Sequence, residues 1–149
     1  MPTTLARTGH IGINVGDLGR SVDFYAEAFG LGVLGRSDHD DGGYAFLGHD
    51  GVLVLTLWQQ ATGPFDATSA GLHHLSFEVD DIEDVRAAEA RLRSMGATFV
   101  HDGVVPHREG VSSGGIFFLD PDGTRLEVFA ATGATGTAPH TEAPTCGFF

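Results

Sequence analysis

The chain has 149 residues, of which 42% are hydrophobic and 19% charged, a balance typical of one globular domain with a substantial core. Its formal charge of −12, with arginine supplying all eight Lys or Arg residues, argues against nucleic acid or an anionic membrane surface as a partner. It has no run of about 18 apolar residues and no leader-like start. The single cysteine, Cys146, fits a reducing compartment, so we expect a cytoplasmic protein.

The first half of the chain reads as a strand, a helix and three further strands. Apolar and polar residues alternate over residues 10–15, which is the period of a half-buried strand. Helical spacing over residues 18–29 is bounded by the N-cap residue Asp17 and the stop residue Gly30. Strands are then expected at residues 31–36, 44–47 and 52–58, with Asp50-Gly51 as a hairpin turn.

The second half repeats this order. We expect a strand at residues 72–79, a helix at 82–95 between Asp81 and Gly96, and strands near 98–101, 115–119 and 125–130. The loop at residues 101–114 is longer than its counterpart and is a candidate lid over a site. The tail has the composition of a flexible segment, yet its two final phenylalanines favour docking on a neighbour.

The repetition is visible in the amino-acid sequence of the two halves. HIGINVGDL at residues 10–18 matches HLSFEVDDI at 74–82, and FLGHDGVLVL at 46–55 matches FLDPDGTRLE at 118–127. One supersecondary unit is therefore written twice. We predict a single α+β domain of two tandem βαβββ modules, with module 1 at about 8–58, a linker at 59–71, module 2 at about 72–130 and a tail at 131–149.

Side-chain alternation places three metal-ligand types on one face of the two modules. His10 and His74 open equivalent strands, opposite the apolar side chains, and Glu127 lies on the same face of the last strand. In the aligned repeat, Leu55 stands where the second module has Glu127. Two imidazoles and one carboxylate predict a divalent metal site with open positions, which favours Fe²⁺, with Mn²⁺, Ni²⁺ or Zn²⁺ as alternatives.

The same alternation suggests what surrounds the ion. It predicts a substrate pocket with an apolar wall, suited to a small substrate with a hydrocarbon or aromatic portion, and lined by Leu53, Leu55, Leu57, Phe129 and Arg108. Arg125 is a candidate anchor for an anionic substrate group, although a surface pair with Asp122 is the commoner outcome. His101 and His107, beside the long loop, are candidate proton relays, although loop histidines are more often simply exposed.

Paired βαβββ units, a histidine opening the first strand of each, and a final Asp-Gly-x-x-Leu-Glu-Val hairpin resemble the vicinal oxygen chelate superfamily, over about residues 8 to 130. That group includes glyoxalase I, extradiol dioxygenases, fosfomycin-resistance enzymes and bleomycin-resistance proteins. The resemblance implies two modules whose sheets curl into a half-open barrel around a divalent metal, commonly in a homodimer. It places His10, His74 and Glu127 on three of the family's ligand positions, and Leu55 near the fourth.

The departure at Leu55 shapes the functional expectation. Four-ligand relatives carry a carboxylate or amide there, so the resemblance favours a dioxygenase over a glyoxalase-like lyase or isomerase. A fosfomycin-type resistance enzyme is a further alternative, but such enzymes use several cations, and only Arg108 and Arg125 are candidates here. The non-enzymatic alternative is a bleomycin-resistance-like protein, whose acidic surface would bind a cationic antibiotic.

Overall fold

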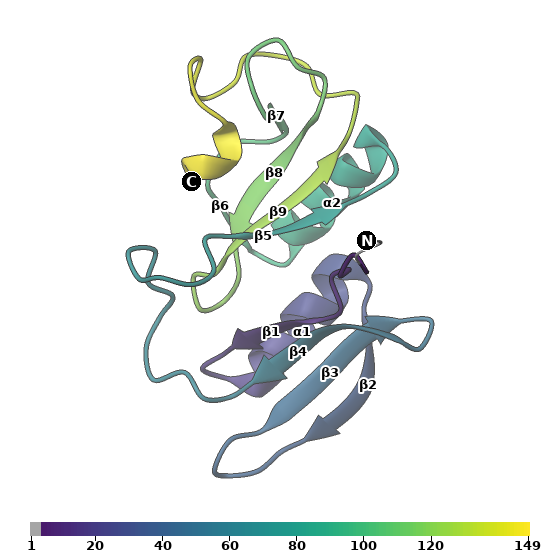
Figure 1. Ribbon diagram of the computed structural model, residues 1–149, viewed down its shortest axis with the longest axis vertical. Coiled ribbons are helices and arrows are strands. Elements are labelled where there is room, and N and C mark those ends of the chain that lie inside the picture. Colours follow the sequence, from purple (N-terminus) through teal and green to yellow (C-terminus); the bar gives the residue numbers. More distant parts are fainter. Residues whose placement is uncertain (1–3) are drawn as a thin grey trace. The chain divides into compact units, whose positions relative to one another are not determined.

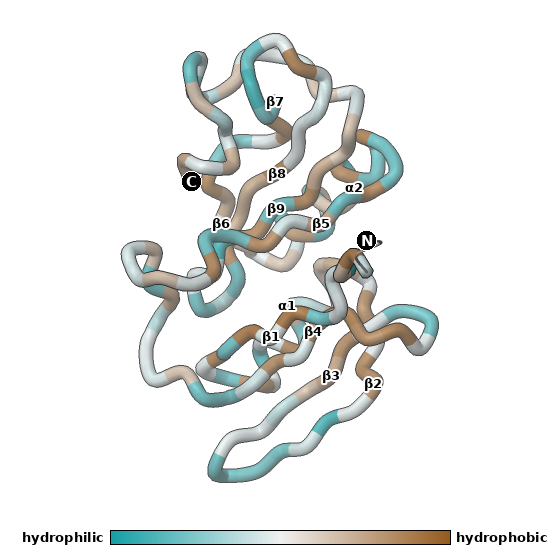
Figure 2. Tube along the Cα trace, in the orientation of Figure 1, coloured by the Kyte–Doolittle hydropathy of each residue, from teal (hydrophilic) through white to brown (hydrophobic). Residues whose placement is uncertain are grey.

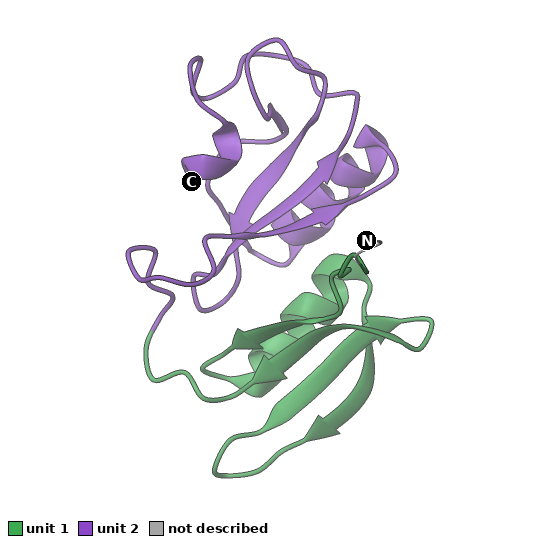
Figure 3. Ribbon diagram, viewed as in Figure 1, with its two compact units in different colours: residues 1–63 green, residues 64–149 purple. Residues whose placement is uncertain are grey.

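A computed structural model describes residues 4–149, and these form two compact units, unit 1 up to Gly63 and unit 2 from Pro64 to Phe149 (Figures 1 and 3). The boundary falls inside the segment that the sequence predicts as a linker. No helix among the described residues combines the length and the apolar character needed to cross a bilayer.

Unit 1 is a four-stranded sheet with one helix. In chain order it contains β1 (Ile11–Asn14), α1 (Leu18–Phe29), β2 (Gly32–Ser37), β3 (Tyr44–His49) and β4 (Val52–Trp58). The strand order is β1-β4-β3-β2, with β1 parallel to β4 and the other pairs antiparallel. The parallel pair follows from the helical crossover between β1 and the hairpin strands.

Unit 2 repeats the arrangement with one addition. It contains β5 (Leu75–Glu78), α2 (Ile82–Ser94), β6 (Thr98–Phe99), β7 (Val105–Pro106), β8 (Gly114–Leu119), β9 (Arg125–Ala130) and a single 3₁₀ turn, η1 (Thr145–Gly147). The strand order is β5-β9-β8-β6, β5 lies parallel to β9, and β7 pairs with β8 outside this path. The α+β fold of two βαβββ units is therefore confirmed, with β7 as an element that the sequence reading treated as loop.

The helix boundaries follow from local chemistry. The Asp17 carboxylate accepts a hydrogen bond from the Arg20 N–H at 2.9 Å, and Gly30 ends α1 in the left-handed region at φ 65°. The Asp81 carboxylate caps α2 in the same way, through the Asp84 N–H at 3.0 Å. Each helix buries one apolar stripe, which in α2 consists of Val85, Ala88 and Leu92.

Apolar residues gather along the strands and recur in the helices, whereas the loop between β2 and β3 is hydrophilic (Figure 2). The fully buried side chains of unit 1 include Val15, Leu18, Tyr25, Leu47, Leu55 and Leu57, and those of unit 2 include Val85, Leu92, Ile116, Phe117, Phe118 and Leu126. Each unit therefore has a core of its own.

The tail of unit 2 is packed rather than loose. The Ala134 N–H donates to the Ser112 carbonyl at 2.8 Å, and the Thr145 N–H donates to the His107 carbonyl at 2.8 Å. The Thr145 hydroxyl, fully buried, donates to the Pro106 carbonyl at 2.6 Å. Phe149 packs within its own unit, against the rings of His74 and Phe117, whereas Phe148 is 51% exposed, and docking of the tail on a neighbour stays a prediction.

Candidate functional site

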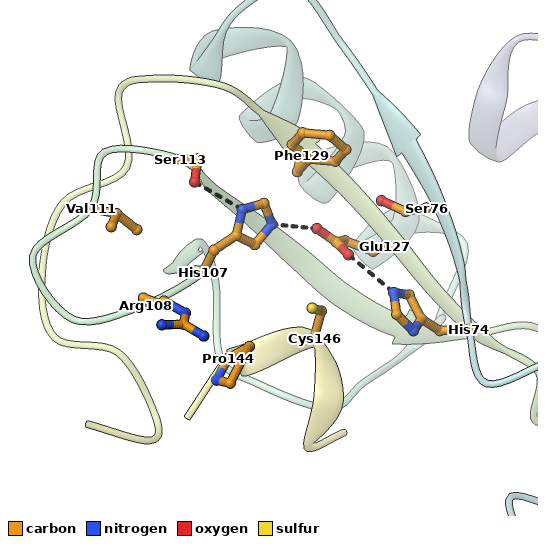
Figure 4. Close-up of a pocket in the computed structure, with 10 residues that line it drawn as sticks. All are labelled: His74, Ser76, His107, Arg108, Val111, Ser113, Glu127, Phe129, Pro144 and Cys146. Atoms are coloured by element: carbon orange, nitrogen blue, oxygen red, sulfur yellow. Dashed lines mark hydrogen bonds and ion pairs between the residues drawn. The ribbon is translucent and has the colours of Figure 1, made fainter. Parts of the chain in front are cut away.

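Glu127 is a buried carboxylate at the centre of the open face of the unit 2 sheet. It lies on β9, opposite Ser76 of β5 and Phe117 of β8, and it is 2% exposed. Two imidazoles flank it: the His107 Nε2 lies 2.5 Å from Oε1, and the His74 Nε2 lies 3.7 Å from Oε2 (Figure 4). A buried carboxylate is stable only when charge or hydrogen bonds offset its desolvation, and these two rings supply that environment.

His74 directly precedes β5, as the sequence predicts. Burial lowers the pKa of His74, while the nearby Glu127 carboxylate acts in the opposite direction. Its Nδ1 lies 2.8 Å from the Nδ1 of His73, and its ring lies against the Phe149 ring with centroids 5.4 Å apart. Histidine binds metal ions as the neutral imidazole, and the Nε2 of His74 lies on the side of its ring that faces Glu127.

His107 follows β7 and is held at both ends. Its Nδ1 lies 3.0 Å from the Ser113 hydroxyl, and its backbone N–H donates to the Ser113 carbonyl at 2.9 Å. Its ring lies 5.1 Å from the Phe129 ring. The short strand β7, paired with β8, is the element that brings this loop residue to Glu127.

A cavity of about 390 Å³ opens over this cluster. It is lined by His74, Ser76, His107, Arg108, Val111, Ser113, Glu127, Phe129, Pro144 and Cys146 (Figure 4). The size suits a small organic molecule. Two of the predicted pocket residues, Phe129 and Arg108, are among the lining residues.

The tail contributes Pro144 and Cys146 to this cavity. Burial and the nearby Glu127 carboxylate both raise the pKa of Cys146. The thiol is therefore protonated at neutral pH and is a poor nucleophile. Cys146 forms part of the wall of the cavity, and its chemistry gives no reason to assign it a reaction.

Of the other candidate residues, His10 lies just before β1 in unit 1 and is exposed there. Its membership of a metal site stays a prediction. Within residues 4–149, no group of three or more His, Cys, Asp or Glu side chains is arranged so that it could hold a metal ion.

His101 and Arg125 belong to unit 2 but do not line the cavity. The His101 ring meets the Phe117 ring edge-on at 5.6 Å, and its Nε2 is buried with no hydrogen-bond partner among the described residues. Burial, with a smaller contribution from His140, lowers the pKa of His101. The Arg125 guanidinium lies over the Phe149 ring at 5.4 Å and 3.4 Å from the His73 Nε2.

The prediction that Leu55 and Leu57 line the substrate pocket is wrong. Leu55 pairs with Ile11 and Leu57 pairs with Ile13, so both side chains share the apolar face of the sheet, and both are completely buried. The cause is a β-bulge in β4. Leu53, which pairs with Gly48, is half-buried and does not line the cavity over Glu127, and its place in a substrate pocket stays a prediction.

In β4, Leu47 faces Leu55 but Gly48 faces Leu53, which leaves Val54 as an extra residue. One extra residue moves every later side chain to the opposite face. Thr56, opposite Gly12, therefore occupies the place that Glu127, opposite Ser76, has in unit 2.

Sequence reasoning missed several lining residues. Ser76 could have been predicted, because it lies two positions after His74 on the same strand and therefore shares the face of His74. Ser113 and Val111 lie in the loop before β8, and Pro144 and Cys146 in the tail, where no side-chain period exists to indicate a direction.

Comparisons with known proteins extend over most of the chain. The family model described as Glyoxalase/Bleomycin resistance protein/Dioxygenase superfamily matches residues 7–128. A lactoylglutathione lyase of Neisseria meningitidis is 30% identical over 125 residues, covering 79% of this chain and 86% of that protein. A catechol-2,3-dioxygenase of Bacillus subtilis is 27% identical over 134 residues, covering 86% of this chain and 44% of that protein.

Among solved structures, a glyoxylase/bleomycin resistance protein/dioxygenase domain from Frankia sp. EAN1pec has a TM-score of 0.72 and 30% identity, covering 86% of this chain and 99% of that chain. The matched range ends one residue before Phe129, so the tail that lines the cavity lies outside the family's matched region.

Proposed function

The chain belongs to the Glyoxalase/Bleomycin resistance protein/Dioxygenase superfamily, and from that membership we propose that it is a metal-dependent enzyme acting on a small, partly apolar organic substrate. The substrate would bind the ion through two adjacent oxygens. The observation that carries the proposal is the buried Glu127 carboxylate with the Nε2 atoms of His74 and His107 directed at its two oxygens.

The imidazole of His74 and the carboxylate of Glu127 suit a divalent ion and would hold it. His10 stays the third ligand that the sequence predicts. Two imidazoles and one carboxylate leave coordination positions open for substrate, and this set suits Fe²⁺ before Mn²⁺, Ni²⁺ or Zn²⁺. When bound, the ion supplies positive charge that stabilises an oxyanion developing on the substrate.

We favour a dioxygenase within the family. Thr56 occupies the position that corresponds to Glu127, so unit 1 offers no carboxylate there as a further ligand or base. The similarity to a catechol-2,3-dioxygenase supports this choice. A lyase is the second candidate, because several lactoylglutathione lyases match this chain at 30% identity or more.

The remaining cavity residues have roles in substrate binding. The Arg108 guanidinium on the rim would attract an anionic group, and Val111 and Phe129 would pack against the apolar portion. Pro144 and Cys146 of the tail would limit how far the substrate extends and would exclude water from that side.

The test is oxygen consumption by protein loaded anaerobically with Fe(II) and then given a panel of catechols. We expect consumption by the wild-type protein and none by His74→Ala. Turnover of lactoylglutathione without oxygen consumption would establish the lyase instead. Tight binding of a cationic antibiotic that is unchanged in His74→Ala, with neither activity, would favour a drug-binding protein.

Assembly as a homodimer and location in the cytoplasm stay predictions. Sedimentation equilibrium tests the first: a mass of about two chains supports it, and a single-chain mass at assay concentration contradicts it.

A further inference from the structure

His107 stands outside the ligand set proposed above, yet it makes the closest polar contact of the site. Its Nε2 lies 2.5 Å from the Oε1 of Glu127, and its Nδ1 lies 3.0 Å from the hydroxyl of Ser113 (Figure 4). The residue comes from the loop between β7 and β8, so it is brought to Glu127 by tertiary structure and not by the strand repeat.

The chemistry of the carboxylate fixes the direction of these hydrogen bonds. A Glu127 that binds a cation is ionised and can only accept, so the Nε2 of His107 must carry a hydrogen and donate it. The Nδ1 accepts from the Ser113 hydroxyl when it carries no hydrogen and donates to that hydroxyl when it carries one, and in both cases the Nε2 donates to Glu127. Ser113, His107 and Glu127 thus form a continuous chain of hydrogen bonds.

The backbone around His107 holds the ring in this position. Its N–H donates to the Ser113 carbonyl at 2.9 Å, and its carbonyl accepts from the Thr145 N–H at 2.8 Å. The ring also packs against Phe129 and Phe117, with centroids 5.1 and 6.4 Å apart. A side chain fixed at both nitrogens and by two aromatic rings can in turn fix its partner.

The two oxygens of Glu127 then differ. Oε1 is engaged by His107, while Oε2 faces the His74 Nε2 at 3.7 Å. We propose that His107 is a positioning residue that holds Glu127 so that Oε2 alone is presented, beside His74, to a divalent cation.

The inference rests on the proposed metal site and deepens it. A ring nitrogen that donates its hydrogen to a carboxylate has no lone pair left for a metal ion, so His107 acts on the ion through Glu127. Outer partners of this kind orient metal ligands and raise their basicity.

Titration with Mn(II) alone tests the assignment, with the dissociation constant measured for the wild type, His107→Ala, His107→Gln and Ser113→Ala. The glutamine amide N–H₂ reaches the place of Nε2 and keeps the donor. We expect His107→Ala to weaken Mn(II) binding about 10- to 100-fold, His107→Gln to restore most of it, and Ser113→Ala to weaken it less than His107→Ala. A glutamine variant as weak as the alanine variant would overturn the assignment.

A second measurement separates positioning from direct ligation. Pulsed electron paramagnetic resonance of Cu(II)-loaded protein counts the imidazole nitrogens coupled to the ion. We expect the same count in the wild type and His107→Gln, and one fewer in His74→Ala. A count that falls by one in His107→Gln would make His107 a ligand and refute the positioning role.

The same experiments distinguish failure of the underlying site. If His74→Ala binds Mn(II) as the wild type does, the proposed metal centre is wrong and the role of His107 falls with it. If His74→Ala loses binding while all His107 variants retain it, the metal centre stands and only the positioning role is refuted.

Discussion

The two units share one topology but present different chemistry on equivalent faces of their sheets. In unit 2 the face carries Glu127 with His74 and His107 directed at its oxygens. In unit 1 the equivalent strand position holds Thr56, whose hydroxyl accepts a hydrogen bond from the Trp58 indole at 3.0 Å.

The neighbours of Thr56 on that face are aromatic. Tyr44 pairs with Trp58 and Phe46 pairs with Thr56, and the ring centroids of Tyr44, Phe46 and Trp58 lie 5.2 to 6.1 Å apart. The two units therefore share one backbone frame but differ in the side chains on this face. The face of unit 2 carries ionisable groups, and the face of unit 1 carries aromatic rings.

The largest effect should come from the carboxylate that distinguishes the units. We expect Glu127→Ala to weaken divalent metal binding by at least about 100-fold, because even changes beyond the ligands cost 10- to 100-fold. Thr56→Ala, at the matching position of unit 1, should leave the affinity unchanged. Titration with Mn(II) measures the affinity of each variant. Equal losses of affinity in the two variants would contradict the proposal that only the unit 2 position binds the metal.

Leu55→Ala tests the assignment of the bulged strand. Leu55 is fully buried on the apolar face, so we expect the free energy of unfolding to fall by about 2–5 kcal/mol. Metal affinity in the folded fraction should not change. Urea unfolding supplies the first quantity. If the variant keeps native stability but binds substrate differently, Leu55 lines the pocket and the assignment to the buried face is wrong.

Thr145→Val tests how firmly the tail is attached to unit 2. The change removes the buried hydroxyl that donates to the Pro106 carbonyl, and it leaves that acceptor without its partner, a loss of about 1–3 kcal/mol. We expect Cys146 to react faster with iodoacetamide as the tail detaches. The exposed Thr141→Val is the matched control and should react at the wild-type rate.

The smallest effect concerns acid stability. Burial lowers the pKa of His101 in the folded state, so the unfolded chain takes up this proton first and stability is lost as the pH falls below about 6.5. His101→Phe should show a smaller loss of unfolding free energy between about pH 7 and pH 5. Urea unfolding of metal-free protein at the two pH values measures this difference. An unchanged loss would show that His101 does not contribute to it.

Much of the fold could be predicted because its signals are local. The ends of α1 follow from Asp17 and Gly30, and the order of helices and strands along the chain follows from the two copies of one pattern. The placement of His74 and Glu127 on one face needed only the alternation of residues along strands, and the structure has their side-chain atoms 3.7 Å apart.

What could not be predicted depends on tertiary contacts. The bulge at Val54 is invisible in the aligned letters, since FLGHDGVLVL and FLDPDGTRLE have equal lengths, and it reversed the assignment of Leu55. The approach of His107 to Glu127 depends on β7, a two-residue strand too short to leave a period. The order of the tail depends on hydrogen bonds to the 101–114 loop and not on its own composition.

Phe149 has a practical consequence for anyone who purifies this protein. Its ring touches both His74 and Phe117, so any residues fused after it begin within reach of the cavity. A polyhistidine tag after Phe149 would bring competing imidazoles close to the proposed metal site. Metal titrations therefore call for a tag elsewhere, or one that is cleaved before the assay.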